Sequence, residues 1–176
     1  MSGWTGFFIL TSDKSAIAAV RKSFPGAISG HPVKIELDKD FIRVDLGPYP
    51  SEVPRADLAK LSSDFGADVI WLRFHSGTET FEFHHWQAGA DLRSLIFGYY
   101  EECTWERVAG TAEPWEREAL FDPRNLQSAL EDAQSAEEKQ ELERIWREAE
   151  LAPGRTEPGL SSSDCVDAVF RYYHLR

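Results

Sequence analysis

Apolar and polar positions divide the first 75 residues into four candidate strands. Residues 4–11 and 68–75 are apolar on both faces of an extended chain, which is typical of strands covered on both sides. Residues 33–37 and 42–46 instead alternate apolar and polar side chains, which predicts strands with one buried face. The polar turn at residues 38–40 joins this second pair into a hairpin.

Two stretches with helical spacing alternate with these strands. The first runs from a capping residue, Ser12 or Asp13, to Phe24, and the second spans residues 51–65. The resulting order is strand, helix, strand, strand, helix, strand. This order predicts a ferredoxin-like βαββαβ core over residues 1–75, with the two fully apolar strands in the interior of the sheet.

Three further strands follow with no helix between them. They are expected at residues 80–86, 92–100 and 102–108, separated by short turns rich in small and polar residues. Such a pattern predicts an antiparallel three-strand meander over residues 76–110. Placed beside the last core strand, the meander extends the sheet to about seven strands.

The pattern becomes helical over residues 111–176. Residues 135–138 form a capping box before an apolar stripe, and a last helix is expected to begin at Ser162 or Ser163. We expect these C-terminal helices to cover the sheet face that the first two helices leave open. Because no repeat or low-complexity tract interrupts the chain, the sequence predicts one α+β domain over residues 1–176.

The charge of the chain is acidic and unevenly distributed. The 176 residues include 30 acidic and 19 basic side chains, and residues 101–150 alone hold 15 acidic and 6 basic ones, a net charge of −9 out of −11. A net charge of −11 repels phosphate groups, so we expect no nucleic acid partner. The acidic third is either a solvated helical face or a surface that contacts a basic protein.

No long apolar run and no leader-like segment is present, so we expect a soluble cytoplasmic protein with no membrane partner. The two cysteines, Cys103 and Cys165, are far apart and form no CxxC pair. Two reduced thiols suit a cytosolic chain better than a disulfide, although a disulfide between them remains an alternative.

A cluster of polar side chains is expected on one sheet face, where Arg73 interrupts an apolar strand. Its members are Arg73, His75, Glu82, His84 and Arg93. A guanidinium inside an apolar strand needs a carboxylate or a ligand anion, so the cluster is either a cross-strand ion pair between Arg73 and Glu82 or an anion pocket. Within the pocket hypothesis, the candidate ligand-binding residues are Arg73, His75, Glu82 and His85.

The motifs of cofactor, metal and nucleophile sites are missing from the sequence. Neighbouring side chains of a strand point to opposite faces, so His84 and His85 cannot both bind one metal ion. Cys103 follows two glutamates, which raise rather than lower the pKa of a thiol. We therefore predict no catalytic residue, no metal site and no cofactor, and the sequence favours a protein that is not an enzyme.

Tryptophans are concentrated in the acidic third of the chain. Trp105 and Trp115 each precede a glutamate and an arginine, and Trp115 is followed by Glu116. Exposed tryptophan and arginine together are typical of protein-binding surfaces, so Trp105, Trp115 and Glu116 are candidate partner contacts. The alternative is that these indoles form a lid over the core.

Residues 92–121, LRSLIFGYYEECTWERVAGTAEPWEREALF, resemble a pattern found in bacterial proteins of unknown function. The matching features are the strand end at residues 105–108, Gly110, and residues 113–116 before an apolar helix. The resemblance implies a bacterial origin and brings no activity or catalytic residue with it.

Three functions are compatible with these features. The leading hypothesis is a non-enzymatic protein-binding module whose acidic half contacts a basic protein, as in bacterial immunity proteins, which are similar in size and charge and inhibit basic nuclease toxins. The alternative is a small-ligand-binding protein or enzyme with a pocket between the sheet and the C-terminal helices. A third is a structural subunit, and the sequence leaves the oligomeric state open.

Overall fold

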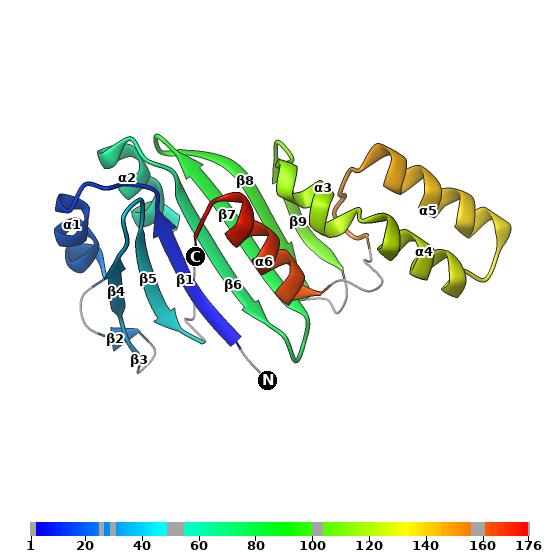
Figure 1. Cartoon of the computed structure of the whole chain (residues 1–176), viewed down its shortest axis with the longest axis horizontal. Helices are drawn as coiled ribbons and strands as arrows, with labels where there is room; N and C mark the ends of the chain where they lie inside the picture. The colour runs from blue at the N-terminus through cyan, green and yellow to red at the C-terminus, as the bar shows by residue number, and fades with distance from the viewer. Residues whose placement is uncertain are drawn as a thin grey trace.

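Seven strands form one antiparallel open sheet at the centre of the computed structural model, which describes residues 3–24, 27–28, 31–48, 55–99, 104–155 and 161–175 (Figure 1). The strands are β1 (Gly3–Ile9), β4 (Lys34–Leu37), β5 (Ile42–Gly47), β6 (Val69–His75), β7 (Thr80–Gln87), β8 (Ala90–Phe97) and β9 (Trp105–Gly110), and β2 (Ala27–Ile28) and β3 (His31–Pro32) form a separate pair. The helices in the described part are α1 (Ser15–Ser23), α2 (Arg55–Phe65), α3 (Pro114–Leu120), α4 (Pro123–Asp132), α5 (Ala136–Glu148) and α6 (Ser162–Tyr172).

The strand order across the sheet is β4-β5-β1-β6-β7-β8-β9. The predicted α+β class, the seven-stranded antiparallel sheet and the meander beside β6 are thereby confirmed. The last two strands are displaced from their predicted bounds, because Gly98, at a φ of 71°, turns the chain out of β8 earlier than expected. Residues 49–54 and 100–103, including the start of the predicted second helix and Cys103, lie outside the described residues.

One sheet face is covered by α1 and α2. Val20 of α1 and Leu58 of α2 are fully buried against Phe7 and Ile9 of β1 and Trp71 of β6. The helices present these residues because their apolar positions recur at helical spacing, while the strands alternate. The result is a dry apolar layer under β5, β1 and β6.

The opposite face is covered by α3 and α6. Trp115 of α3 and Val169 of α6 are fully buried in a cluster with Phe8, Ile70 and Phe83 of the sheet, and α6 crosses in front of β6 and β7 in Figure 1. The predicted cover of this face by C-terminal helices is thus present for two of the four helices.

The other two helices do not lie over the sheet. Figure 1 shows α4 and α5 as a hairpin that extends past β9, the edge strand. Ala129 is the buried residue of α4 and Trp146 that of α5, and the two helices pack against each other. Their apolar stripes are narrow, so the pair buries little beyond its own seam and leaves its polar faces in water.

Side-chain caps fix where the C-terminal helices begin. Ser135 Oγ accepts a hydrogen bond from the backbone N–H of Glu138 at 3.0 Å, which is half of the predicted capping box. The other half differs, because the Glu138 carboxylate accepts from the backbone N–H of Gln134 at 2.8 Å instead of from that of Ser135. The last helix is capped by Ser161 rather than by Ser162 or Ser163, with its Oγ 3.2 Å from the N–H of Asp164. Ser162 is then the first helical residue, and its N–H donates to the Glu79 carboxylate at 2.8 Å. This contact ties the start of α6 to the β6–β7 turn.

None of the described helices combines the length and the apolar character that a membrane crossing requires.

Gly110 provides a test of the β8–β9 edge. Its φ is +85°, and a Cβ atom there would lie 1.9 Å from the carbonyl oxygen of Leu92. We expect Gly110→Ala to lower the free energy of unfolding by at least about 3 kcal/mol, because backbone strain and a backbone clash add. Gly66→Ala is the matched control: its φ is also positive, but no heavy atom lies within 4 Å of the added Cβ.

Chemical denaturation of both variants measures the difference. The control should lose only about 1–2 kcal/mol, the cost of the left-handed backbone for an L-residue. Equal losses in the two variants would show that the close approach to Leu92 does not constrain this edge.

Candidate functional site

Strand β7 carries ionisable side chains to both faces of the sheet in a buried setting. Glu82, His84 and His85 are 1%, 0% and 7% exposed. The register pairs His84 with Trp71 and His85 with Ile70, so the two histidines lie on opposite faces, as expected for neighbours on a strand. Two polar networks result, one on each face.

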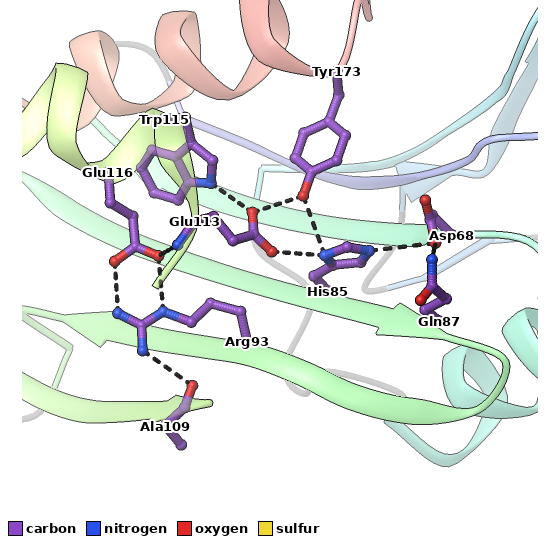
Figure 2. Close-up of polar contacts among 9 residues, drawn as sticks. All are labelled: Asp68, His85, Gln87, Arg93, Ala109, Glu113, Trp115, Glu116 and Tyr173. Atoms are coloured by element: carbon purple, nitrogen blue, oxygen red, sulfur yellow. Dashed lines mark hydrogen bonds and ion pairs between the residues drawn. The ribbon is translucent and has the colours of Figure 1, made fainter. Parts of the chain in front are cut away.

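The network under α3 and α6 is centred on His85 and Glu113 (Figure 2). His85 Nδ1 lies 2.6 Å from Glu113 Oε1, and His85 Nε2 lies 3.5 Å from Asp68 Oδ1 on its other side. Gln87 donates from its side-chain amide to the same Asp68 oxygen at 2.9 Å, which holds that carboxylate in place. The imidazole therefore lies between two carboxylates.

Glu113 joins this network to two helices. Its Oε2 accepts hydrogen bonds from the hydroxyl of Tyr173, just after α6, at 2.6 Å and from Trp115 Nε1 at 2.8 Å. Figure 2 shows both donors pointing at the same carboxylate. The Glu113 backbone N–H donates to Glu116 Oε1 at 2.8 Å, which fixes the first turn of α3.

A buried ion pair continues the network to the sheet edge. Arg93 of β8 donates from Nε and Nη2 to the two oxygens of Glu116 at 2.8 and 2.6 Å, and from Nη1 to the carbonyl of Gly110 at 2.9 Å. The bidentate geometry satisfies both charges inside the fold. Burial raises the pKa of Glu116, and the hydrogen bonds from Arg93 oppose this effect.

Electrostatics favour a protonated His85. Burial by itself lowers the pKa of His85, but the hydrogen bond and charge of Glu113, with Asp68, outweigh it and raise the pKa above 6.5. Burial and the nearby negative charge of Glu113 raise the pKa of Tyr173, which keeps its hydroxyl a proton donor. The cluster is thus a charge-assisted clamp between β7, the start of α3 and the end of α6.

The second network lies on the face that α1 and α2 share. Ser94 Oγ of β8 lies 2.7 Å from His84 Nδ1, and His84 Nε2 lies 2.8 Å from Glu82 Oε1. An ionised Glu82 can only accept, so Nε2 of the neutral His84 ring donates to it and Nδ1 accepts from the Ser94 hydroxyl. Ser94 Oγ in turn accepts from Arg107 Nε of β9 at 2.7 Å. Burial lowers the pKa of His84, which makes the neutral imidazole the stable form.

Arginines surround this second network. Arg73 Nη2 lies 2.6 Å from Glu82 Oε2, and Arg55 Nη2 lies 3.4 Å from His84 Nε2. The Arg73 guanidinium also stacks over the Tyr99 ring, 4.2 Å from its centroid. All three arginines, counting Arg107, are partly exposed, whereas His84 and Ser94 are fully buried.

Ser94, His84 and Glu82 are hydrogen-bonded in the order of a serine–histidine–acid catalytic triad, yet Ser94 is fully buried and shielded from solvent. This geometry can orient the arginines and cannot present a nucleophile to substrate in the same conformation. Within the described ranges, no three or more histidine, cysteine, aspartate or glutamate side chains converge in a geometry that could hold a metal ion.

The four predicted ligand-binding residues do not converge on one site. Arg73 and Glu82 form the cross-strand ion pair that was the alternative to a pocket. His75 lies at the end of β6, where its Nδ1 is 3.1 Å from Thr78 Oγ1. His85 belongs to the opposite face, as does Arg93, which the sequence analysis grouped with Arg73, because β8 pairs Arg93 with His85.

The predicted partner-binding side chains are buried. Trp105 and Trp115 are 0% exposed and Glu116 is 2% exposed. Trp105 packs on Phe97 and Trp115 on Phe83, with ring centroids 5.1 and 5.0 Å apart. These side chains therefore cover the core, and they do not form a surface that a partner touches in this conformation.

Sequence analysis missed Ser94, Arg107, Glu113 and Tyr173. Glu113 had a detectable signal, since Glu113 and Glu116 have the spacing of a capping box just before an apolar helix. Tyr173 had none, because it lies 88 residues from His85 in the chain.

Comparisons of this chain with protein families, with curated proteins and with solved structures give no match.

The raised pKa of His85 predicts a pH-dependent stability. A protonated His85 stabilises the fold, and this contribution is complete below the ordinary value of 6.5 and is lost as the pH rises through the raised folded value. His84, with its lowered pKa, contributes in the opposite direction, so the difference between the wild type and His85→Gln isolates the effect. We expect the stability advantage of the wild type to shrink above pH 6.5, measured by urea denaturation at several pH values. A difference that is constant or grows with pH contradicts the charged clamp.

Tyr173→Phe tests the anchor at the end of α6. The change removes the hydroxyl that donates to Glu113 at 2.6 Å, and we expect it to cost about 1–3 kcal/mol of unfolding free energy because a partly buried carboxylate loses a donor. Tyr172→Phe is the matched control, since Tyr172 is 44% exposed. Thermal or chemical denaturation should separate the two variants, and similar stabilities would argue against the clamp.

Proposed function

We propose that this protein is a protein-binding module that contacts a basic partner through the acidic hairpin, defined as residues 123–150, which comprise α4 and α5. The observation that carries the proposal is the position of this hairpin past the edge strand β9, with few of its residues buried against the body (Figure 1). A projecting hairpin of two amphipathic helices adds little to the core and much to the surface, which suits binding better than stability.

The structure divides the acidic third of the chain into an internal and an external part. Glu113 and Glu116 are hydrogen-bonded inside the fold. The acidic hairpin carries the exposed part, eight acidic side chains against four basic ones. The eight are Glu131, Asp132, Glu137, Glu138, Glu141, Glu143, Glu148 and Glu150.

A hollow of about 600 Å³ between α3 and the hairpin offers an anchoring point. Its apolar part is formed by Phe121, Leu126 and Trp146, and its charged lining is mixed, with Arg117 and Arg147 beside Glu118 and Glu143. A basic segment that inserts one apolar side chain there would combine burial in the hollow with attraction to the net negative charge of the hairpin as a whole. Such an interface associates quickly and weakens as salt is added.

The proposal includes a ferredoxin-like relationship for the first half of the chain and a cytoplasmic location. A ferredoxin-like relationship for the first half is supported by the order β4-β5-β1-β6 with antiparallel neighbours. A cytoplasmic location is supported by the sparse, widely spaced cysteines. A role like that of an immunity protein would follow if the basic partner is a nuclease toxin.

The small-ligand alternative has a different location from the one expected. The space between the sheet and α3 and α6 is filled by aromatic side chains, among them Phe81, Phe83 and Trp115. A ligand would instead contact Arg55, Arg73 and Arg107 on the other face of the sheet.

Affinity capture with matched charge variants tests the proposal. The wild type, a hairpin variant (Glu137→Gln, Glu143→Gln, Glu150→Gln) and a control (Glu36→Gln, Asp40→Asn, Asp57→Asn) are used as bait in lysate of the source organism. Both variants lose three exposed negative charges, so only the location of the charge differs. We expect a basic protein to be retained by wild type and control, released at moderate salt, and at least about fivefold depleted on the hairpin variant. Equal retention by the two variants would place the contact elsewhere and refute the hairpin interface.

A further inference from the structure

The face shared with α1 and α2 changes from apolar to polar halfway across the sheet. Under α1 and α2 it is built from Phe7, Ile9 and Trp71, all fully buried. Over β7, β8 and β9 it is built from Glu82, His84 and Ser94, also buried, with arginines above them. Apolar side chains of similar size would stabilise a sheet face at least as well, so the polar half calls for a functional explanation.

Two arginines of this half lack a carboxylate partner among the described residues. Arg107 donates from Nε to Ser94, and Arg55 approaches His84 at 3.4 Å. Within the described part, Arg73, Arg93, Arg124, Arg144 and Arg171 form ion pairs with carboxylates, whereas Arg21, Arg43, Arg117 and Arg147, like Arg55 and Arg107, form none. Arg55 and Arg107 differ from those four because both contact the His84–Ser94 pair, beside which Arg73 also lies, in a protein of net charge −11.

The buried groups below hold the guanidiniums in place. Ser94 accepts from Arg107 Nε, so the terminal amino groups of Arg107 keep their donors for another acceptor. Glu82 bridges His84 and Arg73, and the Tyr99 ring stacks against Arg73 on its other side. Asp91 also acts on His84 electrostatically, which still leaves three guanidiniums against two carboxylates around the histidine.

We propose that Arg55, Arg73 and Arg107 form a binding site for an oxyanion of the phosphate class, above the buried His84–Ser94 pair. Guanidinium forks donate pairs of parallel hydrogen bonds to phosphate oxygens, and three of them held by the connected His84, Glu82 and Ser94 side chains suit a tetrahedral anion better than a single planar carboxylate. The arginines are partly exposed, so an anion reaches them from solvent without opening the core. Because Ser94 is shielded, the site binds the anion and no covalent step is involved.

Titration with inorganic phosphate at neutral pH, followed by calorimetry and by backbone amide NMR, tests the site in the full chain. We expect saturable binding, with shifts in β7, β8 and β9. Arg55→Gln should weaken binding at least about tenfold, because one of three cationic donors is lost. Arg107→Gln should do the same, and Arg124→Gln, on the exposed surface of α4 beside Asp122, should leave the Kd unchanged.

Arg107→Gln can destabilise the fold, whereas Arg55→Gln should not. Arg107 is hydrogen-bonded to a buried serine, so its variant also requires a thermal unfolding curve. Arg55 makes a single long contact, so Arg55→Gln should fold as the wild type does and decides the matter.

Three results would overturn the proposal. The first is no saturation by phosphate up to about 10 mM, where even a weak site is occupied. The second is an unchanged Kd in folded Arg55→Gln. The third is acetate binding as tightly as phosphate, which would assign the arginines to carboxylate ligands instead.

Discussion

Every side chain of β7 from Thr80 to Trp86 is buried, although Glu82, His84 and His85 are ionisable. A buried charge or unsatisfied polar group destabilises a fold by several kcal/mol unless it finds a partner, so each of these residues requires one. Because strand side chains alternate, the partners must come from two directions. The strand therefore requires polar groups from other segments on both faces, and the arrangement of the second half of the molecule follows from this requirement.

On one face the requirement joins distant segments. His85 forms an ion pair with Glu113 in the β9–α3 connection, and Glu113 accepts a hydrogen bond from the Tyr173 hydroxyl just after α6. One carboxylate therefore links the sheet to both covering helices. The ion pair between Arg93 of β8 and Glu116 likewise joins the sheet to α3. Bidentate and charge-assisted contacts of this kind specify one docking geometry, whereas the surrounding aromatic packing supplies most of the stabilisation. Together they fix α3, and α4 and α5 then continue past β9.

On the other face the same requirement is met by residues of the sheet itself. Ser94 and Glu82 satisfy His84, and the arginines of β6, β9 and α2 complete the layer facing solvent. The molecule thereby separates its charges: carboxylates project on the acidic hairpin, and guanidiniums gather above His84.

Alternation, helical spacing and capping residues are local properties, so most of the strands and helices could be predicted from the sequence, although the last two strands were displaced. The sequence placed strands at residues 68–75 and 80–86 and a capped helix after Ser135, and it indicated that His84 and His85 face opposite ways. Which polar residues meet depends instead on strand register and on how the helices pack on the sheet. Register depends on bulges such as the one between His85 and Trp86, and a shift of one residue would exchange Ser94 and Arg93 between the faces. Tyr173 and Glu113 reach His85 through the packing of α6 and α3 on the sheet, which no local pattern encodes.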